Sequence, residues 1–433
     1  MNDPGRNPVE IAIVGASIAG LTLGLCLQAK GVACRIYEKS PSGKPLGVGI
    51  NILPHASRVL HDLGLGAALN AAAVEPSESG FYNRFGQHIH TDRLGLDAGY
   101  TAPQYSIHRA DLQTILGDAF VARCGAARLT GDTTIVGFEQ HMAGVALHAE
   151  RTTDGAPLPA IDADAAIDCG GIHAAIRKQI HPDEGAPRYS GYNMWRGVSR
   201  WRPFLGGSAM VRIGWLATGK MVIYPIRDAI DGQGNQLINW VMEIETPVHK
   251  AVRDWNKPGR LADFMPAVAD WSFAWLDVPA MLRASQSVLE FPMVDQDPLP
   301  FWSAGRVTLM GDAAHPMVPR GSNGAGQAIL DAQCLSRRIA ETDDIAAAFA
   351  AYEAERLDAT SRVVLLNRVA PPDIVLKEVY ERTGDRPFDN IDDIISKAEF
   401  AALQQRYKEV AGYDLKSLRT EAHKSLRTEA AEM

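Results

Sequence analysis

The feature that most constrains the fold lies near the start of the chain, where a short apolar segment runs into a glycine-rich turn. Residues 9–14 read Val-Glu-Ile-Ala-Ile-Val and stop at Gly15. The turn at 15–20 is followed by apolar residues at helical spacing up to Lys30, and Gly31 ends that helix. A second strand-like segment follows at 32–37. This order predicts a β-α-β unit of the kind that binds a dinucleotide.

The glycine turn carries the chemistry expected of a phosphate site. A turn from strand to helix brings backbone N–H groups and the positive end of a helix against a pyrophosphate. Ser17 stands where the GxGxxG pattern has its middle glycine, and its hydroxyl can donate to a phosphate oxygen. Glu38 follows the second strand, where a carboxylate can accept hydrogen bonds from ribose hydroxyls. An ordinary strand-to-helix turn without a ligand is the alternative for this motif taken alone.

Two later segments repeat the pattern of a strand that ends in glycine and an acid. Residues 161–167 form a strand-like run before Asp168-Cys169-Gly170-Gly171. Residues 307–310 form another, which ends in Gly311-Asp312. A second glycine cluster at 321–326 then opens a further helix, whose positive end can face an electron-rich group.

The middle and the end of the chain differ from this pattern. Residues 185–290 contain many tryptophans and alternating segments such as 221–224, which predicts a mainly antiparallel sheet with one covered face. Residues 326–430 are mostly helical in pattern, with breaks at Pro371-Pro372 and around 384–387. The segment 416–422 recurs at 424–430, which we interpret as a charged terminal helix without chemistry.

Composition excludes several classes of function. The formal net charge of −8 argues against a nucleic-acid partner and against an anionic membrane surface, and no apolar run is long enough to cross a bilayer. The first residues lack the pattern of a signal peptide. The 5 cysteines lack metal-type spacing, which favours buried, reduced thiols and a cytoplasmic protein. A monomer and a homodimer both remain open.

The three glycine-containing blocks, in this order, resemble the FAD-dependent aromatic hydroxylases, the single-component flavoprotein monooxygenases of the para-hydroxybenzoate hydroxylase type. Three segments are most similar in sequence to the phenazine-hydroxylase branch: 105–109 (Tyr-Ser-Ile-His-Arg), 194–198 (Met-Trp-Arg-Gly-Val) and 305–331. The resemblance extends from about residue 8 to about residue 413. It implies an α/β fold: a Rossmann-like FAD-binding domain, an inserted, mainly antiparallel substrate-binding sheet, and a helical C-terminus.

The resemblance also implies a division of the chain and a set of cofactor contacts. The FAD-binding domain is expected at 1–75, 101–184 and 291–370, the sheet domain at 76–100 and 185–290, and the C-terminal helical region at 371–433. The helix that begins near Gly324 would direct its N–H groups at the flavin edge that becomes negative on reduction. The residues expected to bind FAD are Gly15, Ser17, Ile18, Ala19, Gly20, Glu38, Lys39, Val48, Arg109, Asp168, Gly311, Asp312, Gly321, Asn323, Gly324 and Ala325.

The chain departs from the family pattern at two places. Ser17 replaces a glycine, and Cys169-Gly170-Gly171 stands where the family commonly has Ala-Asp-Gly. The second departure leaves open how Asp168 aligns and whether NADH or NADPH is the reductant.

The implied activity is the hydroxylation of an aromatic or heteroaromatic substrate with NAD(P)H and O2 through a flavin C4a-hydroperoxide. A phenazine-like carboxylate is one substrate of this kind, and loss of CO2 during hydroxylation stays open. The cofactor carries this chemistry, so no catalytic triad or metal site is expected. Candidate substrate-binding residues are Trp195, Arg196, Tyr224 and Trp240, and candidates beside the flavin are His55, Pro316 and Arg320. Arg196 or Arg320 could pair with a carboxylate.

Other classes of function fit the sequence less well. A flavin halogenase requires a lysine between the first phosphate loop and the middle of the domain, whereas no lysine occurs between Pro45 and Arg177, and the WxWxIP motif is absent. A plain NAD-dependent dehydrogenase does not explain the Asp168 and Gly311-Asp312 blocks. A non-catalytic sensor or carrier of flavin and an aromatic compound remains the main alternative, and it predicts no substrate-stimulated consumption of NAD(P)H.

Overall fold

A six-stranded sheet forms the centre of the nucleotide-binding part of the computed structural model, which describes residues 10–41, 47–246 and 257–418. All neighbouring strands pair in parallel except the short edge pair. In spatial order the strands are β17 (Ser303–Ala304), β18 (Val307–Leu309), β11 (Ala165–Asp168), β1 (Glu10–Val14), β2 (Ala33–Tyr37) and β7 (Leu129–Thr130). The predicted strand-helix-strand unit is confirmed, with α1 at Ile18–Ala29.

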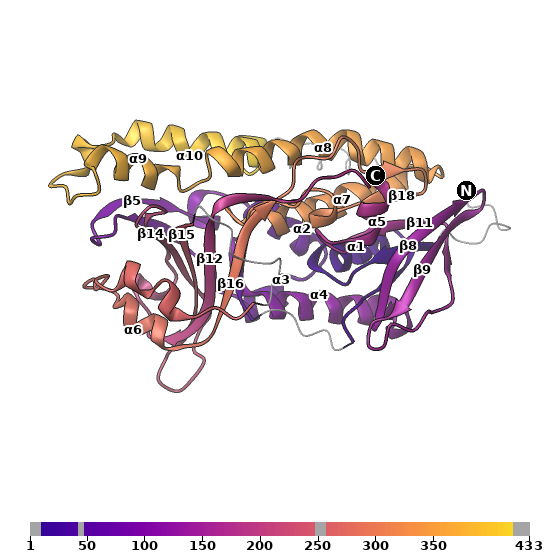
Figure 1. The fold of residues 1–433 in the computed structure, drawn as a ribbon, viewed down its shortest axis with the longest axis horizontal. Helices are drawn as coiled ribbons and strands as arrows, with labels where there is room; N and C mark the ends of the chain where they lie inside the picture. The colour runs from indigo at the N-terminus through magenta and orange to yellow at the C-terminus, as the bar shows by residue number, and fades with distance from the viewer. Residues whose placement is uncertain (1–9, 42–46, 247–256, 419–433) are drawn as a thin grey trace.

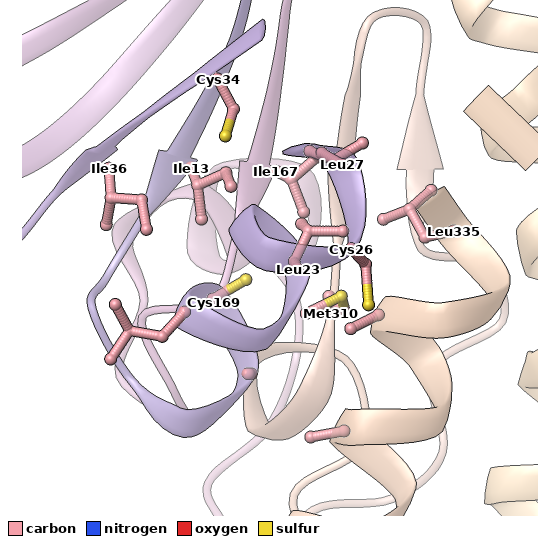
Figure 2. Packing of buried hydrophobic residues seen from close by; sticks show 14 of the residues in the cluster. Ile13, Leu23, Cys26, Leu27, Cys34, Ile36, Ile167, Cys169, Met310 and Leu335 are labelled. Carbon is pink, nitrogen blue, oxygen red and sulfur yellow. The ribbon is translucent and has the colours of Figure 1, made fainter. Parts of the chain in front are cut away.

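Helix α1 is buried along nearly its whole length. Every residue from Ile18 to Leu27 is buried, as expected for a helix that is apolar all round. Figure 2 shows Leu23, Cys26 and Leu27 packed between the strands of the sheet and the helix that carries Leu335. Four of the five cysteines are buried and pack as small apolar residues, as expected, whereas Cys124 is partly exposed.

A seven-stranded sheet forms the second large layer. The strands run in the order β16 (Ser285–Asp295), β12 (Arg188–Trp201), β15 (Gln236–Glu245), β14 (Gly219–Arg227), β13 (Met210–Trp215), β4 (Glu78–Tyr82) and β5 (His88–Arg93). All pairs are antiparallel except β13 with β4. The predicted antiparallel sheet is thus confirmed. The division into domains at residues 76, 101, 185 and 291 stays a prediction.

Two small sheets complete the strands of the described residues. They are β8 (Thr133–His141), β9 (Gly144–Arg151) and β10 (Ile161–Ala163) in one, and β3 (Gly49–Ile52) and β6 (Tyr105–His108) in the other. The run at 161–167, which was predicted as one strand, is divided: residues 161–163 join one of the small sheets and residues 165–168 join the six-stranded sheet. The other strands of the two small sheets were not predicted.

Long helices cover one side of the molecule. In Figure 1 the C-terminal helices run along the long axis, with α8 above the nucleotide-binding part and α9 and α10 above the seven-stranded sheet. The helices besides α1 are α2 (Pro54–Asp62), α3 (Gly66–Ala72), α4 (Arg109–Cys124), α5 (Ala175–Ile180), α6 (Val278–Arg283), α7 (Gly324–Glu341), α8 (Ile345–Val369), α9 (Ile374–Thr383) and α10 (Lys397–Ala411). The expected breaks are confirmed: α8 ends just before Pro371, and α9 ends at Gly384 in the left-handed conformation.

Some sequence features fall outside this description. The first 9 residues, Trp255 and the second copy of the repeated tail at 424–430 lie beyond the described residues. Within the described ranges, none of the helices combines the length and the apolar character that crossing a membrane requires.

Candidate active site

The turn before α1 forms a compact phosphate cradle. Gly15 has a φ of +99°, and a Cβ atom at Gly20 would overlap the carbonyl oxygen of Gly15, so both positions require glycine. Ser17 caps the helix: its Oγ accepts from the Gly20 N–H at 3.3 Å and donates to the Cys169 carbonyl at 3.2 Å. The serine that departs from the glycine pattern therefore fits the turn as its helix cap.

Glu38 holds this turn from the end of β2. Its carboxylate accepts from the Ala16 N–H at 2.7 Å and from the Ser40 N–H at 2.8 Å. Each oxygen retains a lone pair, because a carboxylate oxygen accepts two hydrogen bonds. Glu38 is thus oriented beside the start of α1, although it does not line the cavity described below.

The start of α7 is a second helix N-terminus, and unlike that of α1 it has no side-chain cap. Its N-cap residue, Asn323, makes no side-chain hydrogen bond to the first turn, so the leading N–H groups are available to an acceptor. Gly321 has a φ of +68°, and a Cβ atom there would overlap the hydroxyl of Tyr407 on α10. The Asn323 amide in turn donates to that hydroxyl at 2.9 Å, so α10 fixes the approach to α7.

Asp168 lies beneath the cradle rather than in the cavity. It is completely buried, and its Oδ1 accepts from the Gly170 N–H at 2.8 Å. Burial raises the pKa of this carboxyl group to about 7, although the Gly170 hydrogen bond and Arg177 lower it in part. Asp312, by contrast, is exposed and lines the cavity.

One cavity of about 390 Å³ joins the two helix ends to the seven-stranded sheet. Ser17, Ile18 and Ala19 line it on one side, and Gly324 and Ala325 on another. The guanidinium of Arg109 also faces it, and the buried Nε of this residue has no hydrogen-bond partner within the described chain. Two helix N-termini, glycine-lined walls and an arginine whose Nε has no hydrogen-bond partner match the donors that a dinucleotide such as FAD requires.

The sheet side of the cavity follows the alternation of its strands. Alternate residues of a strand point to opposite faces. On β12, β13, β14 and β15 one set lines the cavity: Met194, Arg196, Met210, Arg212, Lys220, Val222, Tyr224, Val241 and Glu243. The alternate set packs into an apolar core that contains Trp195, Val211, Ile213, Met221, Ile223, Trp240 and Met242.

Two of the candidate substrate-binding residues therefore lie on the wrong face. Trp195 packs against Phe264, and Trp240 packs against Phe264 and donates from its indole N–H to Ser285 at 2.9 Å. The prediction that these two tryptophans line the substrate site is corrected here, because both belong to the core behind the sheet. Arg196 and Tyr224 do line the cavity, and Arg196 donates to the Gly49 carbonyl at 2.7 Å.

The part of the cavity farthest along the sheet is charged, and we call it the charged end; its residues are Arg212, Lys220, Glu243, Arg320 and Asp373. Lys220 forms ion pairs with Glu243, at 2.6 Å, and with Asp373. Burial would raise the pKa of the Asp373 carboxyl, but the neighbouring positive charges hold that pKa well below its usual range. Sequence reasoning missed Arg212, Lys220, Glu243 and Asp373.

Arg320 carries two buried donors without a hydrogen-bond partner at the charged end. The side chain is 4% exposed, and its guanidinium carbon lies 4.1 Å from the centre of the Tyr192 ring. Its Nη2 is 3.7 Å from Glu243 Oε2, too far for a hydrogen bond. Within the described residues, neither Nε nor Nη2 of Arg320 has a hydrogen-bond partner. These two nitrogens form the side-on fork that binds a carboxylate with two parallel hydrogen bonds.

The remaining predicted residues are distributed as follows. Those that line the cavity, besides the ones already placed, are Val48, Gly321 and Asn323. Those that do not are Gly15, Gly20, Glu38, Lys39, Asp168, Gly311, His55 and Pro316. His55 is buried behind α7 and stacks on Tyr413 at 5.6 Å between ring centres. Burial lowers the pKa of His55 to about 3, so it is neutral and is not placed to contact a ligand in the cavity.

Comparison with known proteins places the chain among flavoproteins. Residues 8–196 and 285–366 match the family described as FAD binding domain. The chain is 39% identical over 362 residues to phenazine 1,6-dicarboxylic acid hydroxylase PhzS of Lysobacter antibioticus, covering 83% of this chain and 89% of the relative. It is 33% identical to 3-amino-4-hydroxybenzoate 2-monooxygenase PtmB3 of Streptomyces platensis, over 82% of this chain and 86% of the relative.

Solved structures share the fold. Klebsiella pneumoniae HpxO complexed with FAD and uric acid matches with a TM-score of 0.72 at 22% identity, over 91% of this chain and 96% of that protein. A salicylate hydroxylase substrate complex matches with a TM-score of 0.71 at 22% identity, over 95% of this chain and 97% of that protein.

Proposed function

This chain belongs to the FAD binding domain family and, within it, to the FAD-dependent aromatic hydroxylases, and we propose that it uses NADH or NADPH and O2 to hydroxylate an aromatic or heteroaromatic carboxylate. The observation that carries the proposal is one cavity that joins the N-terminal ends of α1 and α7 to the two Arg320 nitrogens that have no hydrogen-bond partner among the described residues. Relatives named for a phenazine dicarboxylic acid, an aminohydroxybenzoate and a hydroxynicotinate support a carboxylated ring as substrate.

The residues of this chain would hold the cofactor along the first half of the cavity. The N–H groups at the start of α1 would bind its pyrophosphate, while Arg109 and Asp312 would contact the part between pyrophosphate and flavin. The N–H groups at the start of α7 would stabilise negative charge on the flavin ring. FAD, when bound, supplies the hydride acceptance and oxygen transfer that no side chain of the protein can perform.

The sheet would position the substrate in the second half of the cavity. Arg320 would bind the carboxylate through its fork, and the apolar side chains of Met194, Val222 and Val241 would contact the aromatic ring. Arg196 and Tyr224 would lie between substrate and cofactor. Burial would also exclude water from this region, which protects an oxygen-transferring cofactor from side reactions.

The test is the oxidation of NADH and NADPH by the FAD-loaded protein with and without a panel of aromatic and heteroaromatic acids. We expect one or more acids to stimulate oxidation well above the background rate, with O2 consumed and a hydroxylated product formed. Loss of CO2 from the ring, measured in the same assay, decides whether hydroxylation is decarboxylative. An FAD-loaded protein that binds aromatic acids but shows no stimulation with any of them would favour the sensor or carrier function.

A further inference from the structure

Asp373 reaches the charged end from a part of the chain that the family match does not include. The match ends at residue 366, whereas Asp373 precedes α9 in the C-terminal helical region. The residue is 4% exposed, lines the cavity and pairs with Lys220, which lies 153 positions earlier on β14. Although Asp373 occupies the N-cap position of α9, its side chain makes no hydrogen bond to the helix. Its carboxylate is therefore directed to the cavity rather than to helix capping.

The pairing leaves the charged end with one uncompensated positive charge. Arg212, Lys220 and Arg320 contribute three positive charges, and Glu243 and Asp373 contribute two negative charges, giving a net charge of +1. Lys220 is 1% exposed and is held between both carboxylates, so it is not available to a ligand. Arg212 donates to the Ser79 hydroxyl and lies 5.1 Å from the centre of the Phe81 ring. Of these three cations, Arg320 is the one with two nitrogens, Nε and Nη2, that have no hydrogen-bond partner within the described part of the chain.

We propose that Asp373 is a specificity-determining residue that limits the charged end to a single carboxylate of the substrate. Buried carboxylates repel a like charge strongly because little water is present to screen them. A ligand with one carboxylate matches the net charge of +1, whereas two carboxylates on adjacent ring carbons would place a second negative charge against Asp373 and Glu243. This inference rests on the proposed function, because it takes Arg320 as the carboxylate contact.

The test compares two ligands that differ by one carboxylate at the same end of the ring system, 2-naphthoate and naphthalene-2,3-dicarboxylate. Their dissociation constants are measured by calorimetry on the oxidised, FAD-loaded protein, without turnover. We expect the wild-type protein to bind the monocarboxylate at least about 10-fold more tightly than the dicarboxylate. Asp373→Asn should reduce this preference by about 10-fold or more, because the net charge of the charged end rises to +2.

Two further variants separate charge from shape. Lys220→Gln combined with Asp373→Asn returns the net charge to +1 and should restore the wild-type preference. Asp295→Asn is the matched control: Asp295 is also buried and ion-paired, to Arg368 at 2.7 Å, but it does not line the cavity. It should leave the preference unchanged.

Three results would contradict the inference or the carboxylate contact on which it rests. If Asp373→Asn weakens both ligands equally, or if the double variant keeps the altered preference, Asp373 does not set charge selectivity and the inference is wrong. If the wild-type protein binds both acids and Arg320→Ala changes neither, the carboxylate contact assigned under the proposed function fails, and the inference fails with it. A wild-type protein that binds neither acid overturns the inference, whereas the proposed function is decided separately by the oxidation assay with the panel of acids.

Discussion

His315 and Asp331 form a buried pair behind the start of α7, with His315 Nε2 2.5 Å from Asp331 Oδ2. Asp331 also accepts from the Gly311 N–H at 3.2 Å and pairs with Arg356 Nε at 2.8 Å. One carboxylate on α7 therefore ties together the Gly311–His315 segment and α8. Because Asp312 lies within that segment, the pair supports a wall of the cavity without touching a ligand.

Asp331→Asn should destabilise the protein by about 3 kcal/mol, because it leaves Arg356, whose side chain is only 12% exposed, without its countercharge. The FAD dissociation constant should also rise, since the Gly311 segment is released from α7. Denaturant unfolding and a fluorescence titration with FAD measure these two effects. The control is Glu355→Gln, which removes a partly exposed carboxylate paired with Arg337 at 2.8 Å and should cost less than about 1 kcal/mol. Equal losses in the two variants would contradict the assignment.

Arg320→Ala should raise the KM for a carboxylated substrate by about 100-fold, the effect of losing a charge-assisted bidentate contact. The KM of the matching neutral carboxamide should change much less. Arg320→Lys should recover only part of the loss, because an ammonium group cannot offer two parallel donors. Arg227→Ala on the same strand as Lys220 is the control, since Arg227 pairs with Asp111 at the surface and does not line the cavity. An equal rise in KM for acid and carboxamide would rule out the carboxylate contact.

Asp168 should make the unfolding free energy depend on pH. Its folded-state pKa is about 7, above the unfolded value near 3.8, so the folded protein holds this proton more tightly than the unfolded chain. Stability from this group is fully present below about pH 4 and is lost as pH rises through about 7, by an amount on the order of a few kcal/mol. Asp168→Asn removes the titrating group, so its stability relative to wild type should rise between pH 5 and pH 8. Unfolding curves at a series of pH values measure this difference, and a constant difference would contradict the expectation.

Tyr407→Phe should weaken the contact between α10 and the start of α7. The Tyr407 hydroxyl accepts from Asn323 and donates to Asn367 Oδ1 at 2.6 Å, and all three residues are buried. Its removal leaves Asn367 Oδ1 without this donor and should cost about 1–3 kcal/mol of unfolding free energy. FAD affinity should fall as well, because Asn323 is the N-cap of α7. Unchanged FAD affinity in a variant that is measurably less stable would show that α10 supports the fold but not the cofactor site.

The elements that sequence reasoning predicted correctly are specified by local signals. The first strand, α1 and the second strand follow from a glycine turn and two kinds of apolar periodicity, all within about 30 residues. The break between α8 and α9 follows from two prolines. Such features need no knowledge of distant contacts.

The charged end of the cavity could not be predicted in that way. Lys220 pairs with Glu243 because β14 and β15 place them opposite each other in register, and with Asp373 because α9 returns over the sheet. Neither contact has a local signal. The tryptophans illustrate a different error. Trp195 and Arg196 are adjacent on one strand, so their side chains point to opposite faces of the sheet and only one of them can face the cavity. The sequence does not show which of the two faces the cavity.

The alternation of the seven-stranded sheet also bears on how such a protein can change over time. The residues of the large apolar core behind the sheet and the residues that line the cavity lie on the same strands but on opposite faces. Positions such as Val222 and Val241 can therefore accept new side chains, and so new ring shapes, while Trp240 and Ile223 keep the sheet packed. A single inserted or deleted residue within a strand would exchange the two sets and lose both at once. The substrate side of the cavity can therefore diversify by substitution, whereas a change in strand length would disrupt both the cavity and the core.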